Sequence, residues 1–443
     1  MAAIIKNNLR IRALNQFRQQ VNELPTYFFL SGQEPWEDEN NPPIPVDASD
    51  TSNQALSDVL ALKRVSANDM VAVVPRTNWA SGTIYDHYSQ DVDLINSRNP
   101  VTGDFYRFYV LTEDFNVYKC LSNYYSAPST FRPTGTNPEA FRTPDGYTWK
   151  YMYTIQAPDA FQFMTSNWMP CYTLTSNDGS SQWNSQQSAV PGTIDNIIIT
   201  SSGVGYSDIT LPTITITGDG SGAEAVAEVN FQTGEITDII VTNPGMGYTQ
   251  ATITINDSEG SGSSAQAVAT IGPRHGHGAN PMEELGANYL MIKTTIDGSE
   301  GGVFPTSVTY RKTGLIQLPL DVNSPGLAVS LPQGNAKTYA QGETITGSTS
   351  NATGEIVLVD YTNDILYINN IVGQFLQSET ISSQSYNQTG IDTIFSSNSP
   401  LVAQLHPYSD VKENTGELLY IANREFISRV DNQKEDIIAI VSF

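Results

Sequence analysis

The chain has 443 residues, with 46 acidic and 22 basic side chains and a formal net charge of −24. A surface this acidic repels phosphate groups, which argues against nucleic acids and anionic membranes as partners. Aromatic residues make up 10% and apolar residues 39% of the chain, so it can bury a core and does not belong to the disordered class. It has no apolar run of about 18 residues, and no membrane insertion is expected.

Charged residues are only 15% of the chain, whereas Ser, Thr, Asn, Gly, Tyr and Pro are abundant. This composition suits short strands joined by many turns. We therefore predict a mainly β fold, with an antiparallel β-sandwich-like core, a few helices and two inserted β-repeat modules.

The N-terminal stretch predicts a basic amphipathic helix. No acidic residue precedes Glu23, and apolar residues recur at helical spacing, at Leu14, Phe17, Val21 and Leu24. Four basic side chains lie in this stretch: Lys6, Arg10, Arg12 and Arg18. Lys6, Arg10 and Arg12 interrupt any apolar segment, which disfavours a signal peptide. The helix either packs on its own subunit or contacts an acidic neighbouring chain.

The next two segments are a strand at Tyr27–Leu30 and an acidic, proline-rich loop over residues 32–43. The loop carries four carboxylates, at Glu34, Glu37, Asp38 and Glu39. Acid–base chemistry or a hard cation are possible roles for such a group. Because the loop lacks the Asp-x-Asp-x-Asp-Gly pattern of calcium loops, a solvated loop is the preferred interpretation.

A helix is expected over Ser52–Ser66, with Ala55, Val59 and Leu62 on one side. Strands are expected further on, over residues 69–74, 105–111, 116–121 and 147–155. Several aromatic residues in this region are candidates for stacking on sugars: Trp79, Tyr85, Trp149 and Tyr151. Such residues are more often interface or core anchors.

Residues 192–273 contain the same pattern twice. Gly192 and Gly234, Tyr206 and Tyr248, and Ala225 and Ala267 are pairs that lie 42 positions apart. A spacing kept over this length marks a duplicated β unit. A second duplication follows within residues 336–395, where Ile345 and Ile381 lie 36 positions apart. The final strand, Asp436–Phe443, is apolar on both faces and is therefore expected inside a sheet.

Motifs that would carry chemistry are missing from the sequence. Cys120 and Cys171 form no Cys-x-x-Cys pair, so two buried free thiols are expected. His275 and His277 would face one side of a strand, but no further metal ligand stands at the right spacing. The chain also lacks a P-loop and a Gly-x-Ser-x-Gly elbow. We predict no enzyme activity, no catalytic residue, no cofactor and no metal.

Several short segments, in this order and spacing, resemble the dimeric baseplate wedge subunit (gene product eight) of T-even-type contractile-tailed bacteriophages. They are Tyr27–Phe29, Pro35–Trp36, Val74–Trp79, Val117–Leu121, Asp145–Tyr151, Gly416–Arg424 and Ile437–Phe443. The resemblance covers roughly residues 1–190, 274–335 and 396–443. Residues 191–273 and 336–395 depart from the family as two inserted duplicated β modules.

The resemblance implies a structural protein of the virion tail baseplate, assembled in the host cytoplasm. It implies a homodimer that bridges other wedge proteins, with possible host surface contact through the inserts. The residues proposed for interfaces are Lys6, Arg10, Arg12, Arg18, Trp36, Trp79 and Tyr85. The alternative function is a tail-surface adhesin that binds host glycans through the inserted repeats.

Overall fold

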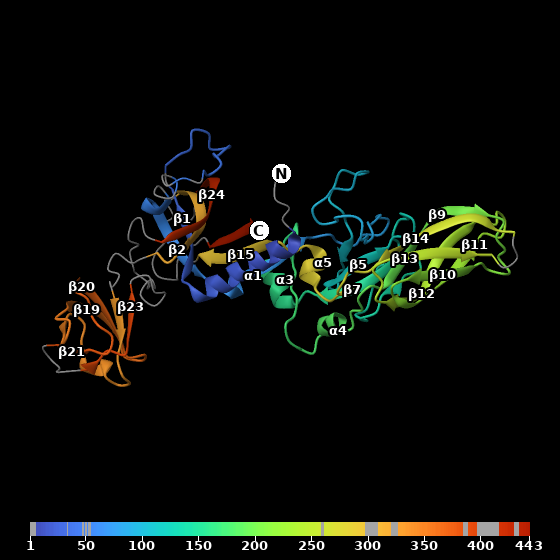
Figure 1. The fold of residues 1–443 in the computed structure, drawn as a ribbon. Coiled ribbons are helices and arrows are strands. Elements are labelled where there is room, and N and C mark those ends of the chain that lie inside the picture. Colours follow the sequence, from blue (N-terminus) through green and yellow to red (C-terminus); the bar gives the residue numbers. More distant parts are fainter. Residues whose placement is uncertain are drawn as a thin grey trace. The chain divides into compact units, whose positions relative to one another are not determined.

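The computed structural model describes residues 6–32, 34–46, 48, 51, 55–257, 261–296, 309–319, 327–383, 389–396, 416–428 and 434–443. The chain folds into two compact units (Figure 1). The first contains residues 1–14, 71–291 and 440–443, and the second contains residues 15–70 and 292–439. The fold is mainly β and its sheets are antiparallel, as predicted. The first helix, α1 (Asn7–Glu23), buries Ile11, Leu14 and Val21 within its own chain.

An aromatic core lies in the first unit. It is built on the sheet β4 (Tyr109–Leu111), β5 (Asn116–Ser122), β7 (Thr148–Thr154) and β6 (Phe141–Arg142), in that order. The buried cluster contains Tyr85, Val110, Tyr118, Cys120, Tyr147, Trp149 and Tyr151. Tyr147 stacks on Trp149 with ring centroids 5.4 Å apart. Two short helices follow, α3 (Ala157–Phe163) and α4 (Ser181–Gln187). The two cysteines are free and buried, as predicted.

The C-terminal strand lies at the edge of a second sheet. The order is β25 (Glu435–Ser442), β15 (Tyr289–Ile296), β3 (Met70–Pro75) and β8 (Trp168–Pro170). The expectation of an interior strand is therefore wrong. The reason is visible in the side chains: Ala439 is buried, whereas Ile438 is 37% exposed, so one apolar face of β25 is turned partly to solvent.

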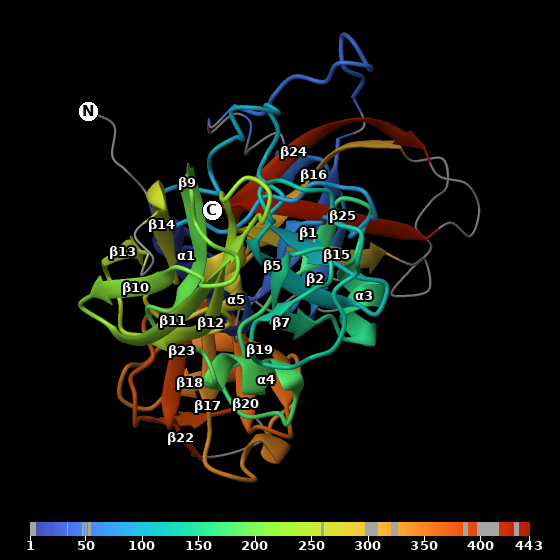
Figure 2. The same ribbon diagram turned by 90° about the vertical axis from the view of Figure 1, so that its right-hand side faces the viewer.

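The first duplication forms a four-stranded and a two-stranded sheet that curve around one core within the first unit, and together they are called the barrel below (Figures 1 and 2). Its strands are β9 (Ile194–Val204), β10 (Thr213–Gly218), β11 (Ser221–Val229), β12 (Ile236–Met246), β13 (Ala251–Asn256) and β14 (Ser263–Ile271). The first strand of each copy pairs with the last strand of the other: β9 with β14, and β12 with β11. The middle strands β10 and β13 pair with each other. Because β13 also lies next to β14 and β12 next to β9, the two copies enclose one core.

The pairing obeys a pseudo-two-fold axis. Ala227 of the first copy pairs with Ile239 of the second, and Ala269 of the second copy pairs with Ile197 of the first. The two alanines occupy equivalent positions in the repeat, and so do the two isoleucines. The register shifts also match, since each lies at the same place in both pairs of strands. The repeated residues therefore hold two interlocked copies together, and neither copy forms a closed module alone.

The repeated glycines make room for the repeated tyrosines. Tyr206 and Tyr248 are 6% and 4% exposed, and their hydroxyls accept hydrogen bonds from Ala265 N and Ala223 N at 3.3 and 3.4 Å. A Cβ on Gly262 would overlap the Tyr206 ring, and a Cβ on Gly220 would overlap the Tyr248 ring. Gly220 and Gly262 each stand just before a strand, and only glycine lets the backbone pass this close to the ring.

This packing predicts that Gly262→Ala destabilises the barrel. The added methyl group meets the buried Tyr206 ring, and overpacking of this kind costs about 1–3 kcal/mol. The measurement is the free energy of unfolding from urea titration. Gly390→Ala is the control, because nothing lies within 4 Å of a Cβ built there. Equal stability of the two variants would contradict the proposed packing.

The second unit contains the sheet β2 (Val59–Val65), β1 (Thr26–Ser31), β16 (Thr309–Gln317) and β24 (Glu417–Ser428), in that order. The helix expected over residues 52–66 is wrong for residues 59–65. Only residues 51 and 55–57 of the described part are helical there, and a 3-10 helix follows at Ala67–Asp69. Backbone pairing of β2 along β1 outweighs the local apolar spacing, because burial in a sheet overrides helix propensity.

The second duplication forms its own sheet, β17 (Leu327–Ser330), β18 (Thr344–Gly347), β19 (Thr353–Asp360), β20 (Ile365–Val372), β21 (Thr380–Ser382), β22 (Thr389–Gly390) and β23 (Thr393–Ser396). The order is β22-β21-β18-β19-β20-β17-β23. Because β17 belongs to it, this module begins before the expected boundary at residue 336. A 3-10 helix at Ala336–Thr338 leads into its core.

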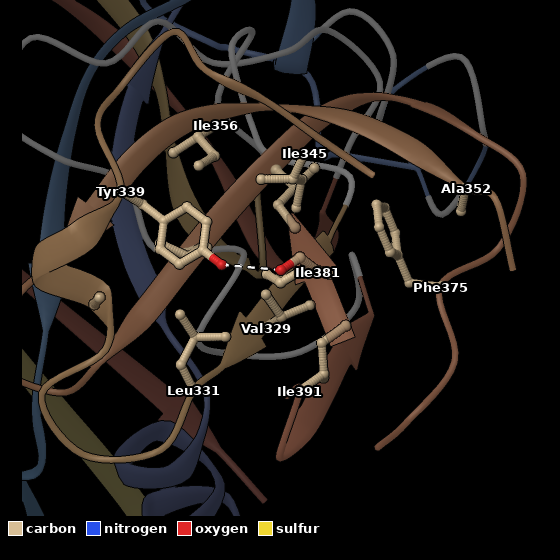
Figure 3. Packing of buried hydrophobic residues seen from close by; sticks show 12 residues of the cluster. Val329, Leu331, Tyr339, Ile345, Ala352, Ile356, Phe375, Ile381 and Ile391 are labelled. Atoms are coloured by element: carbon tan, nitrogen blue, oxygen red, sulfur yellow. Dashed lines mark hydrogen bonds between the residues drawn. The ribbon is translucent and has the colours of Figure 1, made fainter. Parts of the chain in front are cut away.

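Figure 3 shows the interior of this second module. Ile345 and Ile381, which occupy equivalent positions in the two copies, are both fully buried. Thr346 pairs with Ser382, its own counterpart 36 residues later, so a pseudo-two-fold axis passes between β18 and β21. The Tyr339 hydroxyl donates to Ile381 O at 3.2 Å and closes one side of the core. Both inserts therefore place two copies around one core. In the second module, however, β18 pairs with β19 and β21 pairs with β22, each within its own copy.

Candidate functional site

A buried cluster of charged side chains lies where the barrel segment of the chain joins the rest of the first unit. Lys119 Nζ is 2.9 Å from Glu284 Oε2, and His277 Nδ1 is 3.3 Å from the same oxygen. The other ring nitrogen of the histidine, Nε2, is 2.6 Å from Asp195 Oδ2. The four side chains are between 2% and 7% exposed. Sequence reasoning singled out His277 alone.

Each member of the cluster comes from a different element. Lys119 is on β5 and Asp195 is on β9, whereas His277 lies in the segment that follows β14. Glu284 is on the short helix α5 (Pro281–Leu285), which begins at Pro281 and is capped by the Asn280 side chain. The cluster therefore ties the first strand of the barrel, the segment after its last strand, and the aromatic core together.

Backbone groups and rings complete the cluster. Gly278 N donates to Glu284 Oε1 at 2.7 Å, and Thr193 Oγ1 donates to Asp195 Oδ1 at 2.7 Å. The Tyr88 ring lies 4.4 Å from Lys119 Nζ and makes an edge contact with the His277 ring. Each of the four carboxylate oxygens of Asp195 and Glu284 therefore has at least one partner, and buried charges are tolerated when they are paired in this way.

The electrostatics of the cluster favour a charged Glu284. Burial alone raises the pKa of this carboxyl group, but the Lys119 ammonium and the bonds from His277 and Lys119 outweigh it and lower the pKa to about 2. Nearby Lys150 is also buried, and burial lowers its pKa. Such perturbed groups often mark functional sites. Here both carboxylates, those of Asp195 and Glu284, bond to groups of the same unit. The cluster therefore has a structural role, which is to hold the separate elements together.

Two further sets of polar contacts join the barrel to the rest of the first unit. Asp238, on β12, accepts from Arg142 at 2.7 Å and from the Tyr125 hydroxyl at 3.2 Å. The Gln90 side chain bonds along β14, accepting from Ile271 N at 3.0 Å and donating to Ala269 O at 3.5 Å. Together with the charged cluster they hold the barrel at several points.

A groove of about 410 Å³ lies beside the Gln90 contact. It is bordered by Ser89–Asp91 on one side and by residues 251–253 and 267–270 on the other. It sits between β13 and β14, which form no ladder with each other among the described strands. At the equivalent place in the other copy, Thr213 pairs with Val226. The groove is thus a local opening of the barrel wall.

The residues proposed for interfaces are dispersed in the structure. Lys6 and Arg12 are exposed on or beside α1, while Arg10 and Arg18 are half-buried. Trp36 and Trp79 are half-buried, and their indole N–H groups donate to Arg424 O at 2.8 Å and Ser129 Oγ at 3.1 Å. Tyr85 is 1% exposed and belongs to the aromatic core. Its side chain is therefore a core anchor and is not available to a partner.

The acidic loop near residue 39 is pinned to the second unit. Arg311 forms a two-pronged pair with Glu39, with Nε at 2.9 Å and an Nη at 2.7 Å from Oε1. This bond to Arg311 lowers the pKa of Glu39. The expectation of a solvated loop is therefore wrong for Glu39, which has a structural partner. Among the described residues, no group of three or more His, Cys, Asp and Glu side chains could hold a metal ion.

No protein-family model matches this chain, and no curated protein is significantly similar to it. Within the part of the chain that the structure describes, no helix has both the length and the apolar character needed to cross a bilayer.

The charged cluster predicts that Glu284→Gln strongly destabilises the first unit. The substitution leaves buried Lys119 without its counter-charge, and breaking a buried pair costs about 3–5 kcal/mol. The measurement is the free energy of unfolding by urea at neutral pH. Glu228→Gln, at an exposed barrel position, is the matched control and should change little. A loss below about 1 kcal/mol for Glu284→Gln would contradict a charged cluster that holds the fold.

The same cluster predicts a pH dependence. The folded pKa of Glu284, about 2, lies below the ordinary value of 4.5, so the unfolded chain takes up a proton first as the pH falls. The stability that Glu284 contributes is therefore complete above pH 4.5 and is lost between pH 4.5 and 2. Unfolding measured across this interval should show a flatter profile for Glu284→Gln than for the native chain. Parallel profiles would contradict the assignment.

Proposed function

We propose that this protein is a non-enzymatic structural component of a phage tail baseplate wedge, working as a homodimer that bridges other wedge proteins. The proposal starts from the ordered segments that resemble the wedge subunit. What supports it in the structure is the place of those segments. They pack with one another, and the two inserted repeats have interiors of their own.

The packing can be followed in both units. In the first, Val117–Leu121 and Asp145–Tyr151 form the paired strands of the aromatic core. In the second, Tyr27–Phe29 on β1 and Gly416–Arg424 on and before β24 flank the same strand, β16. Segments far apart in the sequence thus build the two frames. These segments carry much of the resemblance, and they lie mainly in the paired strands that form the cores of the two units. Such a placement suits a structural protein.

The proposal predicts that a phage lacking this gene builds no complete baseplates. Removing a bridging subunit leaves its neighbours without a shared contact surface. The measurement is electron microscopy of tails from cells infected with the deleted phage. The intact gene supplied from a plasmid is the control and should restore baseplates. Complete baseplates formed in the absence of the protein would refute a structural role.

A second candidate function is a tail-surface adhesin that binds host glycans through the barrel. The observation that favours it is a ladder of uncharged polar side chains on the outer face of β10 and β13. Thr215 faces Thr254, Thr217 faces Thr252 and Thr213 faces Asn256, and all six side chains are exposed. Hydroxyl and amide groups in a regular array can bond to several sugar hydroxyls at once.

The adhesin candidate predicts that the double variant Thr215→Val, Thr254→Val binds host surface polysaccharide about tenfold more weakly than the native chain. Valine keeps the shape and the strand preference of threonine and removes the hydroxyl group. Binding is measured with the full chain on immobilised polysaccharide. Thr362→Val, exposed on the second module, is the control. Unchanged binding by the double variant, or none by the native chain, would reject the glycan role.

A further inference from the structure

The outer edge of β25 differs from the other long edges that the structure describes. Natural proteins cover or charge such edges, because unpaired N–H and C=O groups attract another strand. At β24, Trp36 bonds to the edge carbonyl of Arg424. At β14, the Gln90 amide bonds to the edge. The edge strand β2 carries Lys63 and Arg64.

β25 has none of these devices over its central part. Residues 437–441 are Ile, Ile, Ala, Ile and Val, with no charge and no proline. The strand is eight residues long and, among the described strands, stands last in its sheet with β15 as its neighbour. A long, apolar, uncharged edge of this kind is a template for pairing with another strand.

The direction of the backbone groups is fixed by one contact. Phe443 N donates to Asn288 O at 3.1 Å, directly beyond the paired ends of β25 and β15. Because N–H and C=O groups alternate sides along a strand, the odd-numbered residues of β25 point to β15. The backbone N–H and C=O groups of the even-numbered residues, including Ile438 and Ile440, therefore point to the open edge of the sheet.

We propose that β25 pairs antiparallel with β25 of a second copy of this chain, about a two-fold axis at Ala439. The axis places Ile438 opposite Ile440 of the partner and Asp436 opposite Ser442. Residues with outward groups then face each other, and each such pair exchanges two N–H···O bonds, roughly eight in all. The two four-stranded sheets become one continuous sheet.

The sequence of the strand fits this axis. Asp436 and Ser442 bound a run of apolar residues that is symmetric in polarity about Ala439. No like charges face each other, since Asp436 meets a serine. The residue on the axis is in a non-hydrogen-bonded pair, where the Cα atoms approach to about 4.5 Å. Alanine is the smallest residue with a Cβ, and it stands at this closest approach.

We infer that the partner is a second copy of this chain because β25 is complementary to itself. In a dimer with a two-fold axis the same surface of each copy forms the interface, so no other surface is needed. The inference rests on the proposed function only in that it gives the homodimer a surface. A dimer that forms elsewhere on the chain would overturn this inference and leave the wedge role standing.

The first test is sedimentation equilibrium of the full chain over about a hundredfold range of concentration. We expect a dimer. Ile438→Pro removes an N–H that points away from β15, so the fold should be retained. The dissociation constant of the dimer should rise by roughly tenfold or more. Melting temperature and near-ultraviolet circular dichroism verify folding. Ile209→Lys, at a residue 90% exposed on the barrel, is the control and should leave the dimer intact.

The second test fixes the register. Under oxidising conditions Ala439→Cys should form a covalent dimer, because the paired Cα atoms lie within disulfide range. Ile438→Cys should not, since its partner is residue 440. The native thiols Cys120 and Cys171 are buried. A chain that stays monomeric, a dimer indifferent to Ile438→Pro, or equal cross-linking by both cysteine variants would each overturn the proposal.

Discussion

The contact between Lys119 and Glu284 is the interaction on which the first unit depends. Lys119 lies in the middle of a buried strand, where an ammonium group is tolerated only beside a fixed counter-charge. Glu284 supplies that charge from α5, and the same carboxylate also receives His277, which holds Asp195 on the first strand of the barrel. Through Glu284 and His277, the buried lysine is thereby linked to α5, to the first strand of the barrel and to the segment that follows its last strand.

The barrel shows why a duplication can be read from a sequence while its pairing cannot. Glycine and tyrosine recur at 42 residues because each tyrosine needs a backbone segment without a Cβ over its ring. That requirement is local and is visible in the sequence. Whether β11 pairs with β9 of its own copy or with β12 of the other depends on loop lengths and on the shared core. These are properties of the folded chain, so the exchange of strands between copies became visible only in the structure.

The charged cluster and the corrected segment at residues 59–65 illustrate the same limit. The sequence predicted the β class and the two buried thiols. It left the aromatic residues open as interface or core anchors, and it placed Tyr85, which is buried, among the interface candidates. It pointed to His277, but Lys119, Asp195 and Glu284 come from separate elements and share no spacing. A charged residue inside the apolar strand at Lys119 was the one available signal. Residues 59–65 have helical spacing and still form a strand, because pairing with β1 offers more burial than a solvated helix.

The two copies of the barrel have diverged where only one of them meets the rest of the unit. Asp238, which binds Arg142 and Tyr125, stands at the position of Asn196 in the other copy. At the end held by the cluster, residues 249–250 join Tyr248 to β13, whereas at the other end residues 207–212 join Tyr206 to β10. That longer loop carries Ile209, which is 90% exposed. The two copies thus build one symmetric frame and differ in sequence at Asp238, where one of them contacts the rest of the first unit.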